Sequence, residues 1–208
     1  MAGQVDEKLV LVANPGSASR KYALFSSALV EKAQLHFETE NDRLVCTLHD
    51  DDNTPKQINL EFSDLAESAA NVESIFRQQG LLADGQSIDY IGLRIVAPSG
   101  FFMQDHIIDD EVVKRLESLL GLAPIHINAT LSELKLLKSN FSNATIVGVS
   151  DSAFHATKPN YAWNYGINIH DADRLDIKRF GYHGISTAAS INALWDAGKL
   201  APKVIVCH

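Results

Sequence analysis

Cysteine is scarce in this sequence, which has only Cys46 and Cys207 among its 208 residues. Two such distant cysteines provide neither a disulfide framework nor a zinc knuckle, and they fit a reducing compartment such as the cytoplasm. Positive charge is also sparse, because 18 Lys and Arg stand against 26 Asp and Glu, for a formal net charge of −8 at pH 7. Without a Lys/Arg cluster, neither nucleic acid nor an anionic membrane surface is expected as the main partner.

Long apolar runs are missing as well. The opening MAGQVDEKLVLVANPG places acidic residues before a short apolar stretch, so we expect neither a signal peptide nor a membrane span, and no later run could cross a bilayer. The H-E-x-x-H metal spacing, the G-x-S-x-G elbow and the dinucleotide fingerprint are absent too. The common metalloenzyme, serine hydrolase and dehydrogenase interpretations therefore have no support.

What is present is a globular mixture, with 46% hydrophobic and 21% charged residues, which can bury a core. Short apolar, β-branched runs predict strands, and apolar residues at helical spacing predict helices. The predicted strands cover 8–13, 21–25, 44–48, 58–62, 90–96, 144–149 and 204–207, and the predicted helices cover 65–79, 109–119, 129–138 and 187–198. This order, a cluster of strands followed by alternating helices and strands, predicts an α/β fold.

The strand predicted at 204–207 lies at the very end of the sequence. A complete domain seldom ends on an apolar strand of parallel-sheet character, so we expect the sequence to be part of a longer protein. A domain boundary is expected near 148–152.

The segment Asn14-Pro-Gly-Ser-Ala-Ser-Arg-Lys21 places a tight turn between two predicted strands. Its backbone N–H groups, the hydroxyls of Ser17 and Ser19 and the ammonium of Lys21 suit the oxygens of a phosphate. The alternative is an ordinary Gly/Ser turn. The spacing is not that of a Walker loop.

Arg94 lies inside an apolar strand, where an unpaired cation is costly to bury. Either a neighbouring carboxylate satisfies it, or it holds a carboxylate or phosphate ligand. Asp151 directly follows a predicted strand, where α/β proteins usually bind ligands, although it could also cap a helix. His126 and His183 are weaker candidates, because a lone histidine is more often structural than catalytic.

Five motifs, taken in order, resemble the acetate kinase family along the whole chain. They are Asn14-x-Gly-Ser-x-Ser-x-Lys21, Arg94-Ile-Val96, Leu122-Ala-Pro-Ile-His126, Asp151-Ser-Ala-Phe-His155 and Arg179-Phe-Gly-Tyr-His-Gly184. The final Val204-Ile-Val-Cys-His208 is similar to the start of that family's nucleotide-phosphate loop.

The resemblance implies a fold of the sugar kinase/heat-shock protein/actin superfamily, with ribonuclease-H-like domains of mixed sheet flanked by helices. Residues 1–150 would form a carboxylate-binding domain, and 151–208 the start of a second, nucleotide-binding domain. The implied reaction is reversible transfer of the γ-phosphate from ATP to acetate or another short carboxylate, with Mg²⁺, giving an acyl phosphate. A cytoplasmic homodimer is implied for the complete protein, and the fragment alone is expected to be inactive.

The resemblance also implies roles for individual residues. Arg94, Asp151 and His183 would be catalytic, with Arg94 holding the substrate carboxylate. Because a carboxylate is already ionised at neutral pH, Asp151 is expected to orient substrate or Mg²⁺ and not to act as a base. The substrate's methyl group would meet Val96, Ile125 and Tyr182, and His126 would be a substrate-binding histidine of the active site. ATP phosphates would meet Ser17, Ser19, Lys21 and His208, and Asn14 would be associated with Mg²⁺.

The chain departs from the family pattern after Val96, where Ala97-Pro98-Ser99 replaces His-Gly-Gly. Proline fixes φ and removes a donor, so this loop cannot adopt the glycine conformation, and the preferred acid is left open, with propionate and butyrate as alternatives. Two other functions remain at this stage: a half-kinase that binds a carboxylate without catalysis, and another superfamily member such as a sugar kinase or a polyphosphate-cleaving enzyme.

Overall fold

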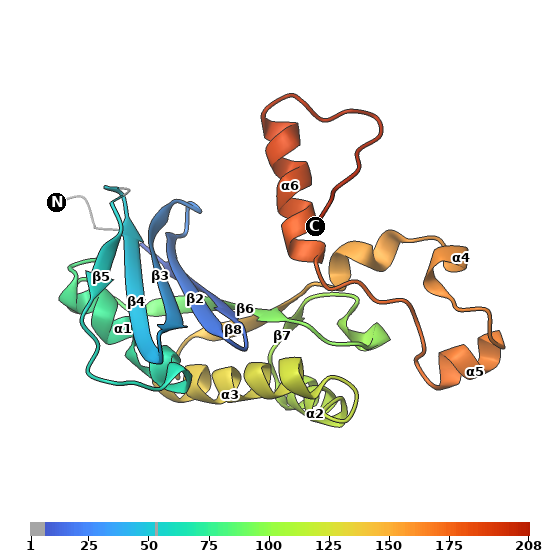
Figure 1. The fold of residues 1–208 in the computed structure, drawn as a ribbon, viewed down its shortest axis with the longest axis horizontal. Helices are drawn as coiled ribbons and strands as arrows, with labels where there is room; N and C mark the ends of the chain where they lie inside the picture. The colour runs from blue at the N-terminus through green and yellow to red at the C-terminus, as the bar shows by residue number, and fades with distance from the viewer. Residues whose placement is uncertain (1–6, 53) are drawn as a thin grey trace.

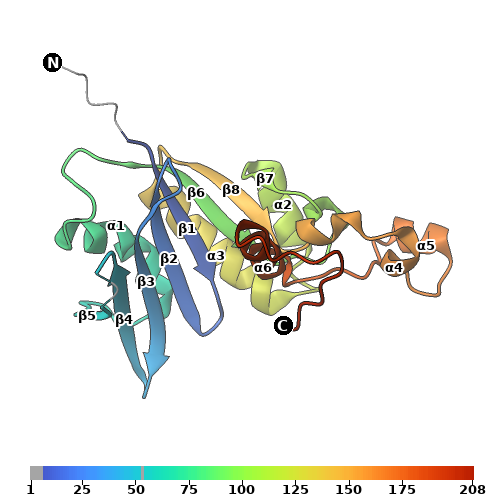
Figure 2. The ribbon, with the colours of Figure 1, turned by 90° about the horizontal axis from the view of Figure 1, so that it is seen from above.

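The computed structural model describes residues 7–52 and 54–208, and within them a single mixed sheet of eight strands has the order β5-β4-β3-β2-β1-β6-β8-β7 (Figures 1 and 2). Strands β1 to β5 form an antiparallel meander, β6 and β8 run parallel to β1, and β7 is antiparallel to β8. The strands are β1 Leu9–Pro15, β2 Ser19–Ser26, β3 Glu31–Glu40, β4 Arg43–Asp50, β5 Lys56–Ile58, β6 Ile88–Ile95, β7 His106–Ile107 and β8 Thr145–Ser150.

Helices α1 (Ser68–Gln78), α2 (Asp110–Ser118) and α3 (Pro124–Asn140) cover one face of the sheet (Figure 1). Successive strand residues alternate between faces. In β1, Leu9, Leu11 and Ala13 are therefore buried against these helices, whereas Val12 and Asn14 lie on the opposite face. That opposite face is where the candidate site lies.

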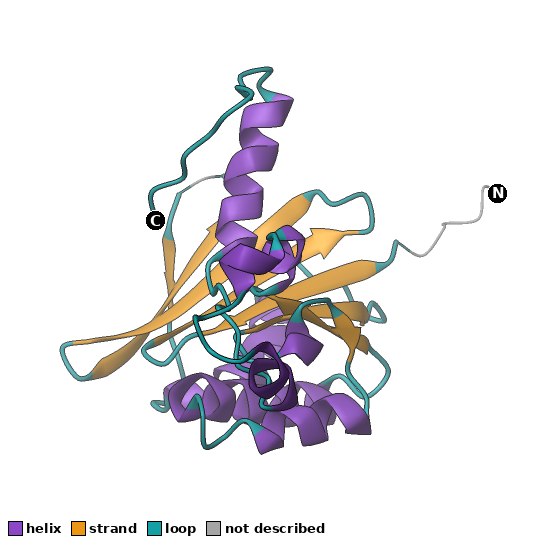
Figure 3. Cartoon of the chain, turned by 90° about the vertical axis from the view of Figure 1, so that its right-hand side faces the viewer, coloured by secondary structure: helices purple, strands orange, loops and turns teal. Residues whose placement is uncertain are grey.

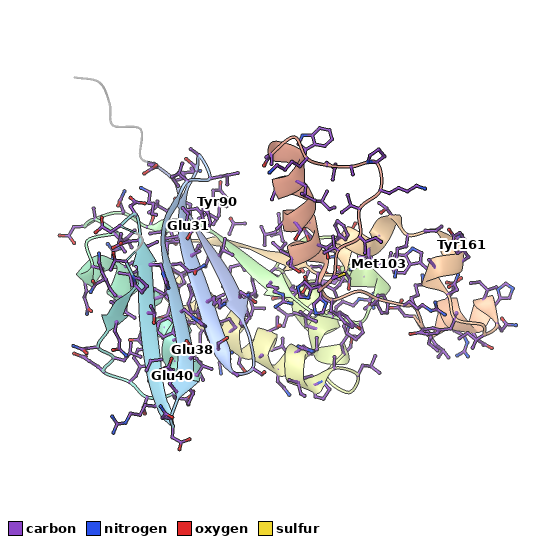
Figure 4. All side chains as sticks on the ribbon, turned by 45° about the horizontal axis from the view of Figure 1, so that its top comes forward. Glu31, Glu38, Glu40, Tyr90, Met103 and Tyr161 are labelled. Atoms are coloured by element: carbon purple, nitrogen blue, oxygen red, sulfur yellow. The ribbon has the colours of Figure 1, made fainter. Side chains whose placement is uncertain are left out.

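The segment after β8 contains η3 (Ala153–Thr157), α4 (Asn160–Trp163), α5 (Ile169–Arg174) and α6 (Gly184–Asp196). Figures 1 and 3 show α6 on the side of the sheet opposite α1 to α3. Only Gly184 of α6 is buried, and Tyr161 on α4 lies far from the sheet and is 86% exposed (Figure 4). The division into domains at 150/151 stays a prediction.

Most predicted elements are present, with shifted ends. The predicted helix 65–79 is a short 3₁₀ turn, η1 (Leu65–Glu67), followed by α1; the helices predicted at 109–119 and 187–198 are α2 and α6; and the one predicted at 129–138 begins five residues earlier, at Pro124. Proline suits this place because its missing N–H is unpaired in any first helical turn. As a result, the whole Pro-Ile-His sequence of the third motif lies in the first turn of α3.

Two of the predicted strands were wrong, and two strands, β3 and β7, were not predicted. The sequence analysis missed β3, whose polar residues alternate with the buried Ala33, Leu35 and Phe37. The strand predicted at 58–62 ends at Ile58, after which the chain packs on the core without pairing. No strand forms at 204–207, where Ile205 is 91% exposed, because no neighbouring strand in the described part of the chain offers it backbone partners.

Among the described helices, none combines the length and the apolar composition needed to cross a membrane. The prediction that the chain does not begin with a signal peptide falls largely on residues 1–6, outside the described residues.

Candidate active site

Three parallel strands, β1, β6 and β8, are neighbours in the sheet, so their carboxyl ends meet at one edge. Asn14 lies near the end of β1, Arg94 near the end of β6, and Asp151 directly after β8. The structure therefore brings together three residues that are far apart in sequence.

Arg94 is the centre of this cluster. Its Nε and Nη2 donate hydrogen bonds to Oδ2 of Asp151 at 2.8 and 2.6 Å, and its Nη1 donates to Oδ1 of Asn14 at 3.1 Å. A longer bond of 3.4 Å reaches the backbone oxygen of Tyr182. The sequence left open whether a neighbouring carboxylate or a ligand satisfies Arg94. The structure supplies the neighbouring carboxylate, that of Asp151. About a third of the Arg94 side chain remains exposed, at 33%, so a ligand can still reach the guanidinium.

Asp151 is 1% exposed and serves two elements at once. Its Oδ2 accepts both bonds from Arg94, while its Oδ1 accepts from the backbone N–H of Ile185, the second residue of α6, at 3.1 Å. A carboxylate at a helix N-terminus is favoured by the orphan N–H groups and the helix dipole. Asp151 therefore fixes the guanidinium and the start of α6 relative to each other.

Gly184, the first residue of α6, is required by this arrangement. A Cβ there would overlap the backbone oxygen of Asp151 and lie 2.7 Å from Cβ of Phe154. We expect Gly184→Ala to lower the free energy of unfolding by about 1–3 kcal/mol, because the start of α6 must shift away from Asp151. Thermal unfolding checks this, and Gly121→Ala is the control, since a Cβ at Gly121 meets nothing within 4 Å. Equal melting temperatures for the two variants would contradict the close approach.

The β1–β2 hairpin carries the predicted phosphate-binding residues. The N–H of Gly16 donates to the oxygen of Ser19 at 2.9 Å and closes the turn. Asn14 pairs with Lys21 across the two strands, which puts both side chains on the same face of the sheet, that of Arg94. Ser17 and Lys21 are exposed. The hairpin is thus joined to the Arg94 cluster through Asn14, and its lysine is exposed where an anion could reach it.

Beneath the hairpin lies a buried polar cluster that the sequence analysis missed. Glu133 of α3, 2% exposed, accepts a hydrogen bond from the hydroxyl of Tyr22 at 2.6 Å. Its other oxygen is 3.3 Å from Nε of Arg20, an ion-pair distance without hydrogen-bond geometry. Burial raises the pKa of both Glu133 and Tyr22. Strand alternation could have predicted this cluster. Successive residues of a strand point to opposite faces, so Arg20 and Tyr22 point into the protein when Lys21 points outward.

The predicted site histidines do not form one group. His183 directly precedes α6 and stacks on His208, with ring centroids 4.0 Å apart and an angle of 18° between the planes. His126 lies instead in the first turn of α3. His155, which the sequence analysis did not nominate, packs so closely on Gly181 that a Cβ there would overlap its ring. Burial, aided by the charge of Lys158, lowers the pKa of His155.

A cavity of about 630 Å³ adjoins this cluster. Its lining includes the three residues predicted for the substrate's methyl group, Val96, Ile125 and Tyr182, and the predicted substrate-binding His126. Arg94 is not part of the lining, but it bonds the backbone of Tyr182 at the cavity's edge. The structure therefore sets an apolar cavity beside a guanidinium, which is an arrangement suited to a carboxylate with an apolar tail.

The described residues contain few side chains that could bind a metal ion. Among them, no group of three His, Cys, Asp or Glu side chains lies close enough together to hold one. The candidate oxygens, on Asn14 and Asp151, already accept from the Arg94 cation. This arrangement does not fit a Mg²⁺ site formed by the described residues alone. The association of Asn14 with the metal stays a prediction.

The acetokinase family model matches residues 9–208. The acetate kinase of Thermoanaerobacter pseudethanolicus is 32% identical over 181 residues, which cover 85% of this chain and 45% of that protein. The acetate kinase of Caldanaerobacter subterraneus is 31% identical over 208 residues, covering 96% of this chain and 51% of that protein. The chain spans about half the length of these curated relatives.

Solved structures show the same fold. A crystal structure of Porphyromonas gingivalis acetate kinase matches with a TM-score of 0.77 and 25% identity, over 92% of this chain and 49% of that one. A propionate kinase from Francisella tularensis also has a TM-score of 0.77, at 22% identity, over 91% of this chain and 49% of that one. The mixed sheet flanked by helices is thus the predicted fold of the sugar kinase/heat-shock protein/actin superfamily. The family match over nearly the whole chain shows that this protein belongs to the acetokinase family.

Proposed function

We propose that the complete protein transfers the γ-phosphate of ATP to a short carboxylate, reversibly, to give an acyl phosphate and ADP. The observation that carries the proposal is the Arg94 cluster, which presents a fixed guanidinium beside an apolar cavity. Family membership supports a kinase that acts on a carboxylate. Acetate is the first candidate and propionate the second, as the relatives' names suggest.

In the proposed reaction, a carboxylate oxygen attacks the γ-phosphorus, the new O–P bond forms, and the bond to the β-phosphate oxygen breaks with its electrons leaving on ADP. The carboxylate is already ionised at neutral pH, so no base has to remove a proton. Arg94 holds the carboxylate in line with the phosphorus, and Asp151 keeps the guanidinium in place through its two hydrogen bonds. Correct alignment is the main contribution a protein makes to this chemistry.

The β1–β2 hairpin and the start of α6 supply the groups that would bind the phosphates of ATP. Ser17, Ser19 and Lys21 offer hydroxyls and a charge to the phosphates of ATP. His183 directly precedes the N-terminus of α6, where the helix dipole favours negative charge, so it suits the oxygens of the phosphoryl group in transfer. His208 stacks on His183 and would meet the nucleotide's phosphates from the same place.

Formation of acyl phosphate by the complete protein tests the proposal. The protein is incubated with ATP, Mg²⁺ and acetate or propionate, and the product is trapped with hydroxylamine as the hydroxamate. We expect a signal that requires ATP and the carboxylate together. Absence of hydroxamate with every short carboxylate would overturn the kinase assignment.

A second candidate function is carboxylate binding without transfer, because the Arg94 cluster and the cavity beside it could hold a carboxylate without any nucleotide. The 208-residue chain is expected to be inactive alone. The same hydroxamate assay separates the two functions: the complete protein produces hydroxamate if it is a kinase, and fails to do so while still binding acetate if it is a binding module.

The proposal also includes the phosphoryl donor, its metal ion, the compartment and the oligomeric state. ATP is the phosphoryl donor, and Mg²⁺ enters with its phosphates, as is usual for this ion. The protein acts in the cytoplasm, which the scarcity of cysteine favours. The complete protein is a homodimer, which the family resemblance implies.

A further inference from the structure

The β1–β2 hairpin is held in place from the face of the sheet that α1 to α3 cover. Arg20 and Tyr22 come directly before and after Lys21 in β2, and they are buried, at 7% and 1% exposed, whereas Lys21 is exposed. Successive strand residues point to opposite faces. The two neighbours of Lys21 in the sequence therefore point toward the helices, while Lys21 itself lies on the face of the candidate site.

One carboxylate, that of Glu133 on α3, meets both of these buried side chains. Its Oε1 accepts the hydrogen bond of the Tyr22 hydroxyl at 2.6 Å, and its Oε2 lies 3.3 Å from Nε of Arg20. The ring of Tyr22 is also packed edge-on against that of Phe37, with centroids 5.8 Å apart and an angle of 82°. Two side chains that begin two residues apart are thus tied to a single point on α3, which fixes the direction in which Lys21 leaves the strand between them.

The guanidinium of Arg20 also reaches the turn of the hairpin. Its Nη1 donates to the backbone oxygen of Ser19 at 3.4 Å, and the same oxygen accepts the N–H of Gly16 that closes the turn, at 2.9 Å. In the β1–β2 ladder, Arg20 pairs with Pro15 next to this turn. A continuous set of contacts therefore runs from α3 through Arg20 to the turn that contains Ser17 and Ser19.

Stability alone does not explain a buried ion pair at this place. Moving two charges out of water is costly, and apolar residues of similar volume often stabilise a protein as well as a buried ion pair does, or better. Burial raises the pKa of Glu133, so its charged form is less stable here than in water. At 7% exposed, Arg20 is also too deeply buried to bind a ligand itself. What apolar residues could not supply is the directed, charge-assisted contacts that hold the hairpin in one geometry.

We propose that Arg20 and Glu133 are positioning residues, which hold the β1–β2 hairpin in the geometry that binds the phosphates of ATP through Lys21. The proposal rests on the proposed function and adds two residues that act through others without touching the substrate. Displacing a positioned group by about 1 Å can lower a rate about 10²-fold. Loss of the pair should weaken the use of ATP and not of the acid, because Arg94 lies on β6 and is held mainly by Asp151.

The triple variant Arg20→Met/Tyr22→Phe/Glu133→Met of the complete protein tests the proposal. It removes the three polar groups together and keeps similar volumes, so none is left buried without a partner and the variant should unfold in urea at no lower a midpoint than wild type. We expect the KM for ATP to rise about tenfold or more, and the KM for acetate to stay within about twofold of wild type. A folded triple variant with an unchanged KM for ATP, or with an equal rise in both KM values, would overturn the proposal.

Two further variants make the test specific. Glu73→Met/Arg77→Met removes an ion pair of the same kind, 2.6 Å long, from α1, and it should leave both KM values within about twofold of wild type. Glu133→Gln keeps the acceptor for Tyr22 but leaves Arg20 without its anion, so we expect a rise of about threefold in the KM for ATP. An equal rise in the α1 variant would overturn the proposal. If the triple variant does not fold, Glu133→Gln decides, and an unchanged KM for ATP in that variant would overturn the proposal.

Calorimetric titration of the complete protein with ATP and Mg²⁺ separates the positioning role from the proposed function. If the wild-type protein yields no hydroxamate with any acid, the proposed function fails. The positioning role then stands only if the wild-type protein binds ATP and the triple variant binds it about tenfold more weakly or worse. Equal affinities, or no binding of ATP by the wild-type protein, would overturn it.

Discussion

Arg94→Ala is expected to lower kcat/KM of the complete protein about 10²- to 10³-fold. The guanidinium is held by Asp151 and Asn14 before substrate arrives, and the loss of one preorganised charged donor from a transition state typically costs about 3–4 kcal/mol. The variant also leaves Asp151, 1% exposed, without its counter-charge. Because the arginine itself is partly exposed, we expect a moderate loss of stability, about 1–3 kcal/mol. Hydroxamate kinetics and urea unfolding measure the two effects separately.

Two further variants show whether the effect belongs to the site. Arg94→Lys keeps the charge but cannot reproduce the planar fork that reaches Asp151 and Asn14 together, so we expect an intermediate rate. Arg43→Ala removes an exposed arginine at the start of β4, and its rate should stay within about twofold of wild type, as expected for a surface substitution. If a folded Arg94→Ala protein keeps a near-wild-type rate, Arg94 has only a structural role.

Glu133→Ala is expected to lower the free energy of unfolding by about 3–5 kcal/mol, the largest stability effect we predict. The substitution leaves Arg20, 7% exposed, as a buried cation without its anion, and removes the acceptor of the Tyr22 hydroxyl. Breaking a buried pair in this way costs more than the pair itself contributes. Urea unfolding at neutral pH checks the prediction.

Glu133→Gln is the matched control, since it keeps an acceptor for Tyr22 and the same shape. We expect it to lose less stability than Glu133→Ala, because the Tyr22 hydroxyl keeps its acceptor, although Arg20 loses its anion in both variants. Equal losses in the two variants would show that the negative charge facing Arg20, and not the acceptor for Tyr22, carries the whole effect.

The pH dependence gives a second readout for Glu133. Burial raises its pKa above the ordinary value of about 4.5, so the folded state retains this proton after the unfolded chain has lost it. The stabilising contribution of the protonated group is therefore complete below pH 4.5 and is lost as pH rises through the raised pKa. Glu133→Gln should lack this part of the pH dependence; if it shows the same pH dependence as wild type, another group is responsible.

The sequence by itself determined the local elements and the family. Apolar periodicity predicted the parallel strands that carry Arg94 and precede Asp151, and the order of the motifs predicted the family now shown. It also identified Val96, Ile125, His126 and Tyr182 as a group, and the structure places them around one cavity. The strands could be predicted because each depends on a short stretch of chain, whereas the grouping of these four residues was implied by the resemblance to the family.

The elements that sequence analysis missed depend on distant partners. Strand β3 is rich in polar residues, and its pairing with β2 and β4 is what makes it a strand. The apolar run at 204–207 shows the converse, since its composition predicts a strand but the described chain gives it no neighbour. Strand formation follows from cross-strand pairing and burial more than from local propensity.

Only the tertiary structure decided how the site is assembled. The sequence left open whether Arg94 meets a neighbouring carboxylate, and the fold supplies Asp151, 57 residues away. It also brings the N–H of Ile185 to that carboxylate across 34 residues, and Glu133 to Tyr22 across 111. The physical reason is that a buried charge or polar group is stable only with a partner, and which partner is near is set by the packing of the whole sheet and its helices.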